Sequence, residues 1–193
     1  MAITTSYRTR SDAVPLRSFK AKGRPSAIAG VGVYAPDRVL SNFDLEKMMD
    51  TSDKWITERT GIHRRHIAAE GTTTFDLATK AARSALDAAG VSAKDLDMIL
   101  VGTSSPDGPF PSVACRVQNE LDAPGAVAWD TLAACTSFVY ALSIADSFIA
   151  SERADTVLVV GAEVMSRMLN YSDRGTAVIF GDGAGAAVVK AAP

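Results

Sequence analysis

The fold is decided by one stretch of the sequence, Ala133-Ala134-Cys135-Thr136-Ser137-Phe138-Val139-Tyr140-Ala141-Leu142. A short apolar approach at 127–131 leads into it, and the run 136–151 carries one charge, Asp146. A helix that is apolar on nearly every side is a buried helix rather than a surface helix. The sequence therefore predicts a core helix at 136–151, with Cys135 at its N-terminus.

Two interpretations of Cys135 remain open on this stretch alone. Unpaired backbone N–H groups and the positive end of a helix dipole favour a thiolate, which makes Cys135 a candidate nucleophile. A free cysteine is equally well known as a small apolar residue of protein cores.

Composition indicates one substantial core in an ordinary soluble protein, with 193 residues, 47% of them hydrophobic, and a net charge of −2. This balance argues against nucleic acid or an anionic membrane as a partner. Two cysteines, Cys115 and Cys135, argue against a disulfide framework and favour a cytoplasmic location. No apolar run approaches the ~20 residues of a membrane span.

The N-terminal segment 1–26 differs from the rest, since it carries six basic residues against the single acid Asp12. It lacks the apolar region of a secretory signal. A transit peptide or an arm that touches a partner is possible in principle, but a solvated extension is the simpler interpretation. The domain itself is predicted to span 27–193.

Strands and helices alternate along this domain. Strands are expected at 27–34, 95–102, 126–130, 156–161 and 184–191, with further extended chain at 62–68 and 176–180. Helices are expected at 42–49, 53–60, 73–89, 112–121 and 136–151. The order predicts a parallel α/β layer. Such a sheet covers one side of the 136–151 helix, so a second chain or a C-terminal half must cover the other.

Seven blocks occur in the order of one family. They are Asp50–Ile56, Arg59–Ile62, Arg65–Ala68, Phe110–Ser112, Ala133–Cys135, Asp173–Thr176 and Phe180–Ala186. Over 27–190 they closely resemble the N-terminal half of β-ketoacyl-acyl-carrier-protein synthase III, the initiating condensing enzyme of type II fatty-acid synthesis. The resemblance implies half of a thiolase-like α/β fold, with a mixed five-stranded sheet in the order βαβαβαββ.

The resemblance also implies an acyltransferase chemistry. Cys135 would take an acyl group from acyl-CoA as a thioester and lose it to a carbanion made by decarboxylating malonyl-acyl-carrier protein. Its backbone N–H would form one arm of an oxyanion hole. No cofactor is implied, since acyl-CoA is the substrate, and a homodimer is expected.

Further site residues follow from the matching positions. Trp55 and Arg174 would sandwich the adenine of CoA, with Arg59 at the same entrance, because an indole and a guanidinium suit a purine. Phe110 would reach across the dimer to line the partner's acyl pocket, which Phe180 would also line. Without the resemblance these are an ordinary half-buried tryptophan, surface arginines and core aromatics.

Some positions depart from the family. Thr136-Ser137 replaces the usual Ala-Gly, and the loop 104–109 is rich in proline, so the acyl primer is left open. The family's catalytic histidine and asparagine belong to a C-terminal half beyond Pro193. His63 and His66 lie too far in sequence from Cys135 to replace that histidine, and they offer no metal site.

Two other features favour structural roles. Cys115 is expected to pack in the core, and Gly181–Gly185 precede extended chain instead of a phosphate-binding helix. The competing functions are a non-catalytic scaffold for dimerisation and a lone cysteine hydrolase. Retention of Cys135, Trp55 and Arg174 argues against the scaffold, and the absence of a well-placed base argues against the hydrolase.

Overall fold

The apolar run Met98–Gly102 forms β4, an inner strand of the sheet in a computed structural model that describes residues 23–192. β4 pairs in parallel with β5 (Val127–Thr131) on one side and with β6 (Thr156–Val164) on the other. It is buried along its whole length. A strand covered on both faces needs such a continuous apolar run.

Two antiparallel strands complete the sheet. β7 (Asp182–Ala191) pairs antiparallel with β6 and with β1 (Ser26–Tyr34), which gives the order β1-β7-β6-β4-β5. The mixed five-stranded sheet is therefore confirmed, and the parallel layer expected from the element order is limited to β4, β5 and β6. The segment between β6 and β7 holds no helix long enough for a crossover, so β7 runs back along β6.

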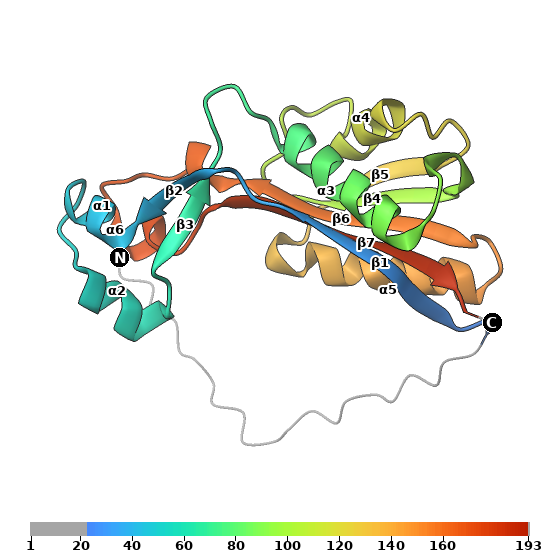
Figure 1. The fold of residues 1–193 in the computed structure, drawn as a ribbon, viewed down its shortest axis with the longest axis horizontal. Coiled ribbons are helices and arrows are strands. Elements are labelled where there is room, and N and C mark those ends of the chain that lie inside the picture. The colour runs from blue at the N-terminus through green and yellow to red at the C-terminus, as the bar shows by residue number, and fades with distance from the viewer. Residues whose placement is uncertain (1–22, 193) are drawn as a thin grey trace, which may run out of the picture.

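Helices cover both faces of the sheet (Figure 1). α3 (Thr74–Ala89) and α4 (Val113–Glu120) lie on one face, where they pack against alternate strand residues such as Ile99 and Val101. α5 (Ser137–Ala150) lies on the other face against Met98 and Leu100. The two faces of β4 thus supply two separate cores.

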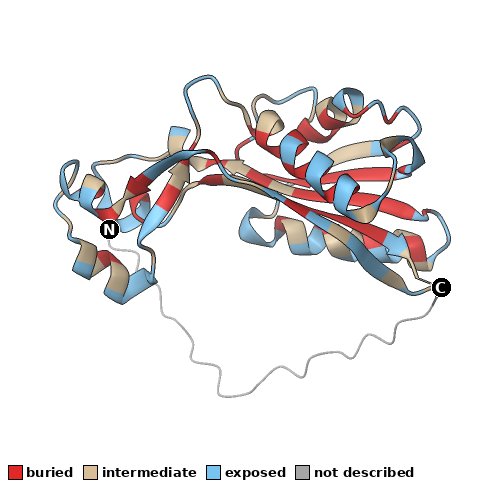
Figure 2. Cartoon of the chain, in the orientation of Figure 1, coloured by how far each residue is buried: buried red, intermediate tan, exposed pale blue. Residues whose placement is uncertain are grey.

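α5 is buried on one side only (Figure 2). Its buried residues are Ser137, Ala141, Ala145 and Ile149. On the opposite side Val139 is 57% exposed, and Tyr140 is exposed beside it. This agrees with the prediction that the sheet covers only one side of the helix and leaves the other side without a cover among the described residues.

A smaller unit extends the sheet at one end (Figure 1). It contains β2 (Arg38–Ser41), β3 (Arg64–Ile67), α1 (Asn42–Glu46), α2 (Asp53–Thr60) and α6 (Arg174–Ala177). Its core consists of Leu40, Leu45, Ile56, Ile67 and Val178. Buried Arg65 ties the unit together by donating to the carbonyls of Leu40 and Val178 and to Asn42. Burial lowers the pKa of Arg65.

Several predicted elements need correction. The first helix ends at Glu46 rather than Met49, and the chain at 176–180 is not extended, because α6 and a turn occupy it. β2 was not predicted, but the strands of the large sheet and the helices between them follow the expected βαβαβαββ order as β1-α3-β4-α4-β5-α5-β6-β7. Residues 1–22 of the basic segment predicted at 1–26 lie outside the described part. No helix between residues 23 and 192 combines the length and apolarity that a membrane crossing requires.

Candidate active site

Cys135 lies in a one-turn 3-10 helix, Ala134–Thr136, between the end of β5 and the start of α5. Its side chain is exposed rather than packed in a core. The preceding residue, Ala134, has a φ of 49°, in the left-handed region that a residue with a Cβ rarely adopts. The Cys135 thiol therefore lies exposed at the N-terminus of α5, on a turn whose backbone is strained.

The carboxyl ends of three parallel strands meet at this edge of the sheet. β5 leads to Cys135, β4 leads to the loop 103–112, and β6 ends beside that loop. Gly102 at the end of β4 and Gly161 within β6 let α5 approach the sheet: a Cβ on Gly102 would stand 2.8 Å from the Cβ of Ser137, and one on Gly161 would stand 3.3 Å from Phe138. Ligands of open α/β sheets commonly bind at such an edge.

The backbone around Cys135 leaves one donor free. The N–H of Thr136 donates to the Ala133 carbonyl at 3.2 Å, and the N–H of Ser137 donates to the Ala134 carbonyl. Among the hydrogen bonds of the described residues, none uses the N–H of Cys135. This N–H and the thiol of the same residue are thus both available at the end of the helix.

The three residues expected at the CoA entrance come together. Trp55 lies on α2. Ser52 caps the N-terminus of this helix, because its hydroxyl accepts the Trp55 N–H at 3.1 Å. The guanidinium carbon of Arg59 lies 4.5 Å from the centre of the Trp55 ring, and that of Arg174 lies 5.0 Å from it. Arg174 also donates to the Asp50 carbonyl at 2.9 Å, which fixes α6 beside α2.

The two phenylalanines expected to line an acyl pocket lie on different segments. Phe110 is 84% exposed on the loop after β4, and Phe180 is half-buried just before β7. The structure gives Phe110 an outward position, and it does not bring the two rings together as an aromatic pair among the described residues.

Two carboxylates missed by the sequence analysis hold the loop that carries Phe110. Asp107 accepts the N–H groups of Thr74 and Phe75 at the start of α3, and it pairs with Arg116 at 2.9 Å. Glu163 accepts the Ser104 N–H at 2.8 Å and the Ser105 hydroxyl. The position of Glu163 at the end of a buried strand was the signal that could have identified it.

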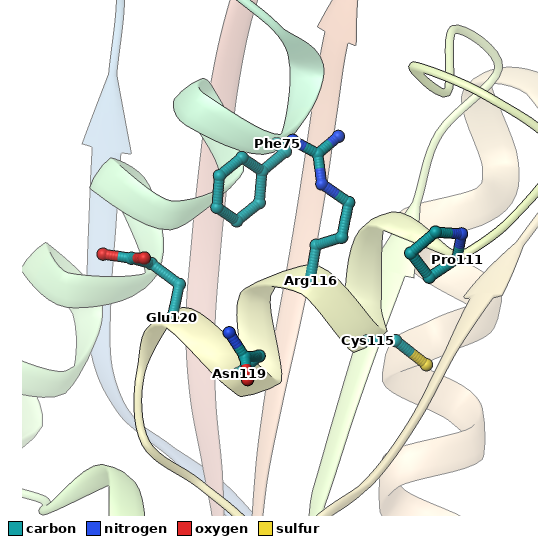
Figure 3. A pocket seen from close by; sticks show the side chains of 6 residues that line it. All are labelled: Phe75, Pro111, Cys115, Arg116, Asn119 and Glu120. Carbon is teal, nitrogen blue, oxygen red and sulfur yellow. The ribbon is translucent and has the colours of Figure 1, made fainter.

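Cys115 is not a core residue, contrary to prediction. It is half-buried, with its sulfur 3.5 Å from the Ala128 carbonyl, and it lines a cavity of about 360 Å³ between α3 and α4. Figure 3 shows the sulfur directed away from Phe75, over which the Arg116 guanidinium stacks at 4.2 Å. Among the described residues, the hydrogen-bond partner of the Cys115 sulfur is a backbone carbonyl and not a base. Cys115 can therefore serve as the control thiol when the reactivity of Cys135 is measured.

The remaining candidates have structural positions. His66 lies on β3 with Nδ1 2.5 Å from the Pro36 carbonyl, and His63 precedes that strand. Gly181 permits close approach, because a Cβ there would stand 2.9 Å from the Cβ of Arg65, and β7 follows it as extended chain. Within residues 23–192 no cluster of three or more potential metal ligands occurs.

Comparison with known proteins agrees with this geometry. The family model described as 3-Oxoacyl-[acyl-carrier-protein (ACP)] synthase III matches residues 129–193. A Beta-ketoacyl-[acyl-carrier-protein] synthase III of Xylella fastidiosa (strain Temecula1 / ATCC 700964) is 58% identical over 164 residues, which cover 85% of this chain and 51% of the relative. The chain spans about half the length of the curated relatives that it matches.

Solved structures lead to the same family. The 3-oxoacyl-[acyl-carrier-protein] synthase III from Aquifex aeolicus VF5 has a TM-score of 0.84 and 54% identity, covering 86% of this chain and 54% of that one. The priming β-ketosynthase from the R1128 polyketide biosynthetic pathway has a TM-score of 0.86 and 37% identity, covering 90% and 52%. These similarities confirm the resemblance and the thiolase-like fold predicted from the seven sequence blocks.

Proposed function

We propose that this chain, which belongs by sequence and fold to the β-ketoacyl-acyl-carrier-protein synthase III family, carries the nucleophile of an acyltransferase that begins fatty-acid or related polyketide chains. The observation that carries the proposal is the placement of Cys135, an exposed thiol on the turn that opens α5, with its own N–H unbonded. A buried structural cysteine would need neither feature.

The first step is transfer of an acyl group from acyl-CoA. The Cys135 thiolate attacks the thioester carbonyl, a carbon–sulfur bond forms, and CoA leaves as its thiolate with the electron pair of the broken bond. The oxygen that becomes negative in the tetrahedral intermediate lies within reach of the Cys135 N–H, which stabilises it.

The second step is condensation. Malonyl-acyl-carrier protein loses carbon dioxide, the resulting carbanion forms a carbon–carbon bond to the acyl group, and the Cys135 thiolate leaves. His63 and His66 lie on or beside β3 and are not proposed to assist. A second thiolase-like half that packs on the exposed face of α5 would supply the family's histidine and asparagine.

The CoA entrance is proposed at Trp55, Arg59 and Arg174. Planar side chains stack on a purine, and the guanidinium charges attract its phosphates. In the structure the Arg174 guanidinium lies directly against the indole, 5.0 Å from its centre. Adenine therefore has to separate this pair if the two side chains are to sandwich it.

A homodimer completes the proposed enzyme. Phe110 is exposed on a loop that Asp107 and Glu163 hold, and this exposure supports the proposal that it enters a partner's acyl pocket. Phe180 is proposed to line the pocket of its own chain. The domain would span 27–193, and the protein would work in the cytoplasm, where acyl-CoA and carrier proteins meet.

Incubation with radiolabelled acetyl-CoA tests the proposal. We expect label on the peptide that contains Cys135, no label after Cys135→Ser, and unchanged labelling after the matched change Cys115→Ala. A folded chain that takes up no label, or that keeps it after Cys135→Ser, contradicts the acyltransferase function and favours a scaffold.

A further inference from the structure

Two hydroxyl groups bind the backbone of the turn that precedes Cys135. The Ser137 hydroxyl accepts the Ala133 N–H at 2.7 Å and donates to the Ala134 carbonyl at 2.8 Å. The Thr136 hydroxyl donates to the Ala133 carbonyl at 2.6 Å. These are the two hydroxyl residues that replace the usual Ala-Gly, so the turn is held in a way that the common sequence does not permit.

The hydrogen bond from the Ser137 hydroxyl to the Ala134 carbonyl affects Cys135 through one rigid group, the peptide unit between Ala134 and Cys135. That carbonyl and the Cys135 N–H belong to the same peptide unit, which is planar, and they point in opposite directions. A hydrogen bond that fixes the direction of the carbonyl therefore fixes the direction of the N–H. The Thr136 hydroxyl fixes the preceding peptide unit in the same manner.

The turn needs such support. A left-handed alanine is less stable than the right-handed form because its Cβ crowds the backbone, and Ala134 has a φ of 49°. Ser137 is only 3% exposed, so water does not compete for its hydroxyl, and both hydrogen-bonding capacities of that hydroxyl are used within the turn. Removal of the hydroxyl would leave the Ala133 N–H and the Ala134 carbonyl without their side-chain partner.

We infer that Ser137, assisted by Thr136, is a positioning residue that aims the Cys135 N–H at the oxyanion formed during acylation. This inference rests on the proposed function, since it assumes that Cys135 is acylated. It goes beyond that function by assigning the alignment of the oxyanion donor to side chains that do not touch the substrate.

Two reactions of the same thiol separate this role from a general effect on the turn. Acylation by p-nitrophenyl acetate forms a carbon–sulfur bond through a tetrahedral oxyanion and releases p-nitrophenolate. Alkylation by iodoacetamide forms a carbon–sulfur bond by displacement of iodide and passes through no oxyanion. Both reagents lack the CoA moiety, so neither depends on Trp55 or Arg174.

We expect Ser137→Ala to slow acylation of Cys135 about 10-fold while alkylation changes less than about 2-fold, because a misaligned oxyanion donor affects only the first reaction. Thr136→Val should act in the same direction but less strongly, and Thr136→Ser should restore the wild-type ratio. Ser147→Ala is the matched control, since its hydroxyl donates to the Ser143 carbonyl on the same helix. Both rates are measured across pH, so that thiolate fraction and intrinsic reactivity separate.

The outcomes are distinct. Equal loss of both rates in Ser137→Ala, or no loss of either, overturns the inference, as does a wild-type Cys135 that is alkylated but never acylated by p-nitrophenyl acetate. Failure of acetyl-CoA labelling with the p-nitrophenyl acetate result intact would instead contradict the proposed CoA-dependent function. Modification of Cys115, measured in the same protease digests of each variant, serves as the control for reagent concentration and for correct folding.

Discussion

Gly102 lies so close beneath Ser137 that a Cβ on the glycine would stand 2.8 Å from the Cβ of the serine. The end of β4 thus supports the turn that carries Cys135 through direct contact with its buried hydroxyl residue. Space for a methyl group is absent, because the backbone N of Phe138 would lie 3.0 Å away on the same side.

Gly102→Ala should therefore destabilise the chain by about 1–3 kcal/mol, as overpacking of a core does. It should also slow acylation of Cys135, because Ser137 has to move. Thermal unfolding and p-nitrophenyl acetate kinetics measure the two effects. Gly185→Ala is the control, since no atom lies within 4 Å of a Cβ there. Equal behaviour of the two variants would contradict the contact argument.

Trp55→Ala and Arg174→Ala should each weaken CoA binding about 10-fold, since each removes one planar surface and Arg174 also removes a charge. Arg174→Lys should not restore binding, because an ammonium group does not stack as a guanidinium does. Isothermal titration with CoA measures these changes. Arg153→Ala is the control on an exposed turn after α5, and an effect of similar size there would point to general charge attraction.

Asp107→Asn should lower the free energy of unfolding by about 1–3 kcal/mol, the range for losing hydrogen bonds to a charged group in a partly buried pair. The Asp107 side chain is 11% exposed, and Arg116 would lose its charged partner. Asp155→Asn is the matched control, because the Asp155 side chain that pairs with Arg24 is 73% exposed and should contribute less than about 1 kcal/mol. Urea unfolding compares the two, and a larger loss at Asp155 would contradict the assignment.

Acid should weaken the cap of α6, the helix that carries Arg174. Hydrogen bonds from the Thr176 hydroxyl and then the Gly175 N–H hold the pKa of Asp173 below its ordinary value of 3.8. A carboxyl with a depressed pKa stabilises the folded state fully above that ordinary value and loses this contribution as the pH falls through its folded pKa. Carboxyl-carbon NMR of Asp173 should give a midpoint below 3.8, and Asp173→Asn should remove the acid dependence of α6. A midpoint at or above 3.8 would contradict the cap.

The sequence predicted the elements whose signals are local. α3 was expected at 73–89 and lies at Thr74–Ala89, where Thr73 caps its start and Gly90 its end. β2 escaped notice because four residues acquire strand character only by pairing with β3. α6 was not predicted, because a single helical turn that begins after an aspartate has no periodicity to detect. The antiparallel direction of β7 follows from the absence of a crossover helix between β6 and β7.

For the site, the motifs predicted which residues gather, and the structure places Trp55, Arg59 and Arg174 together. The hydroxyl of Ser137 could not be oriented from sequence, since its direction depends on the left-handed Ala134 and on Gly102 below it. The position of Cys115 likewise depended on how α4 rests on the sheet. Tertiary contacts, rather than residue types, decided these cases.

The pairing of β1 with β7 has a consequence for biosynthesis. Ser26 pairs with Ala191 and Tyr34 with Ala184, so the first described strand has its only sheet neighbour at the opposite end of the described chain. During translation β1 leaves the ribosome long before β7 exists, so the backbone N–H and C=O groups along its edge have no strand to pair with. Pairings between such distant segments form slowly and expose an unpaired edge to aggregation. We therefore expect a ribosome-bound chain arrested before β7 to depend on chaperones in a way that the finished sheet does not.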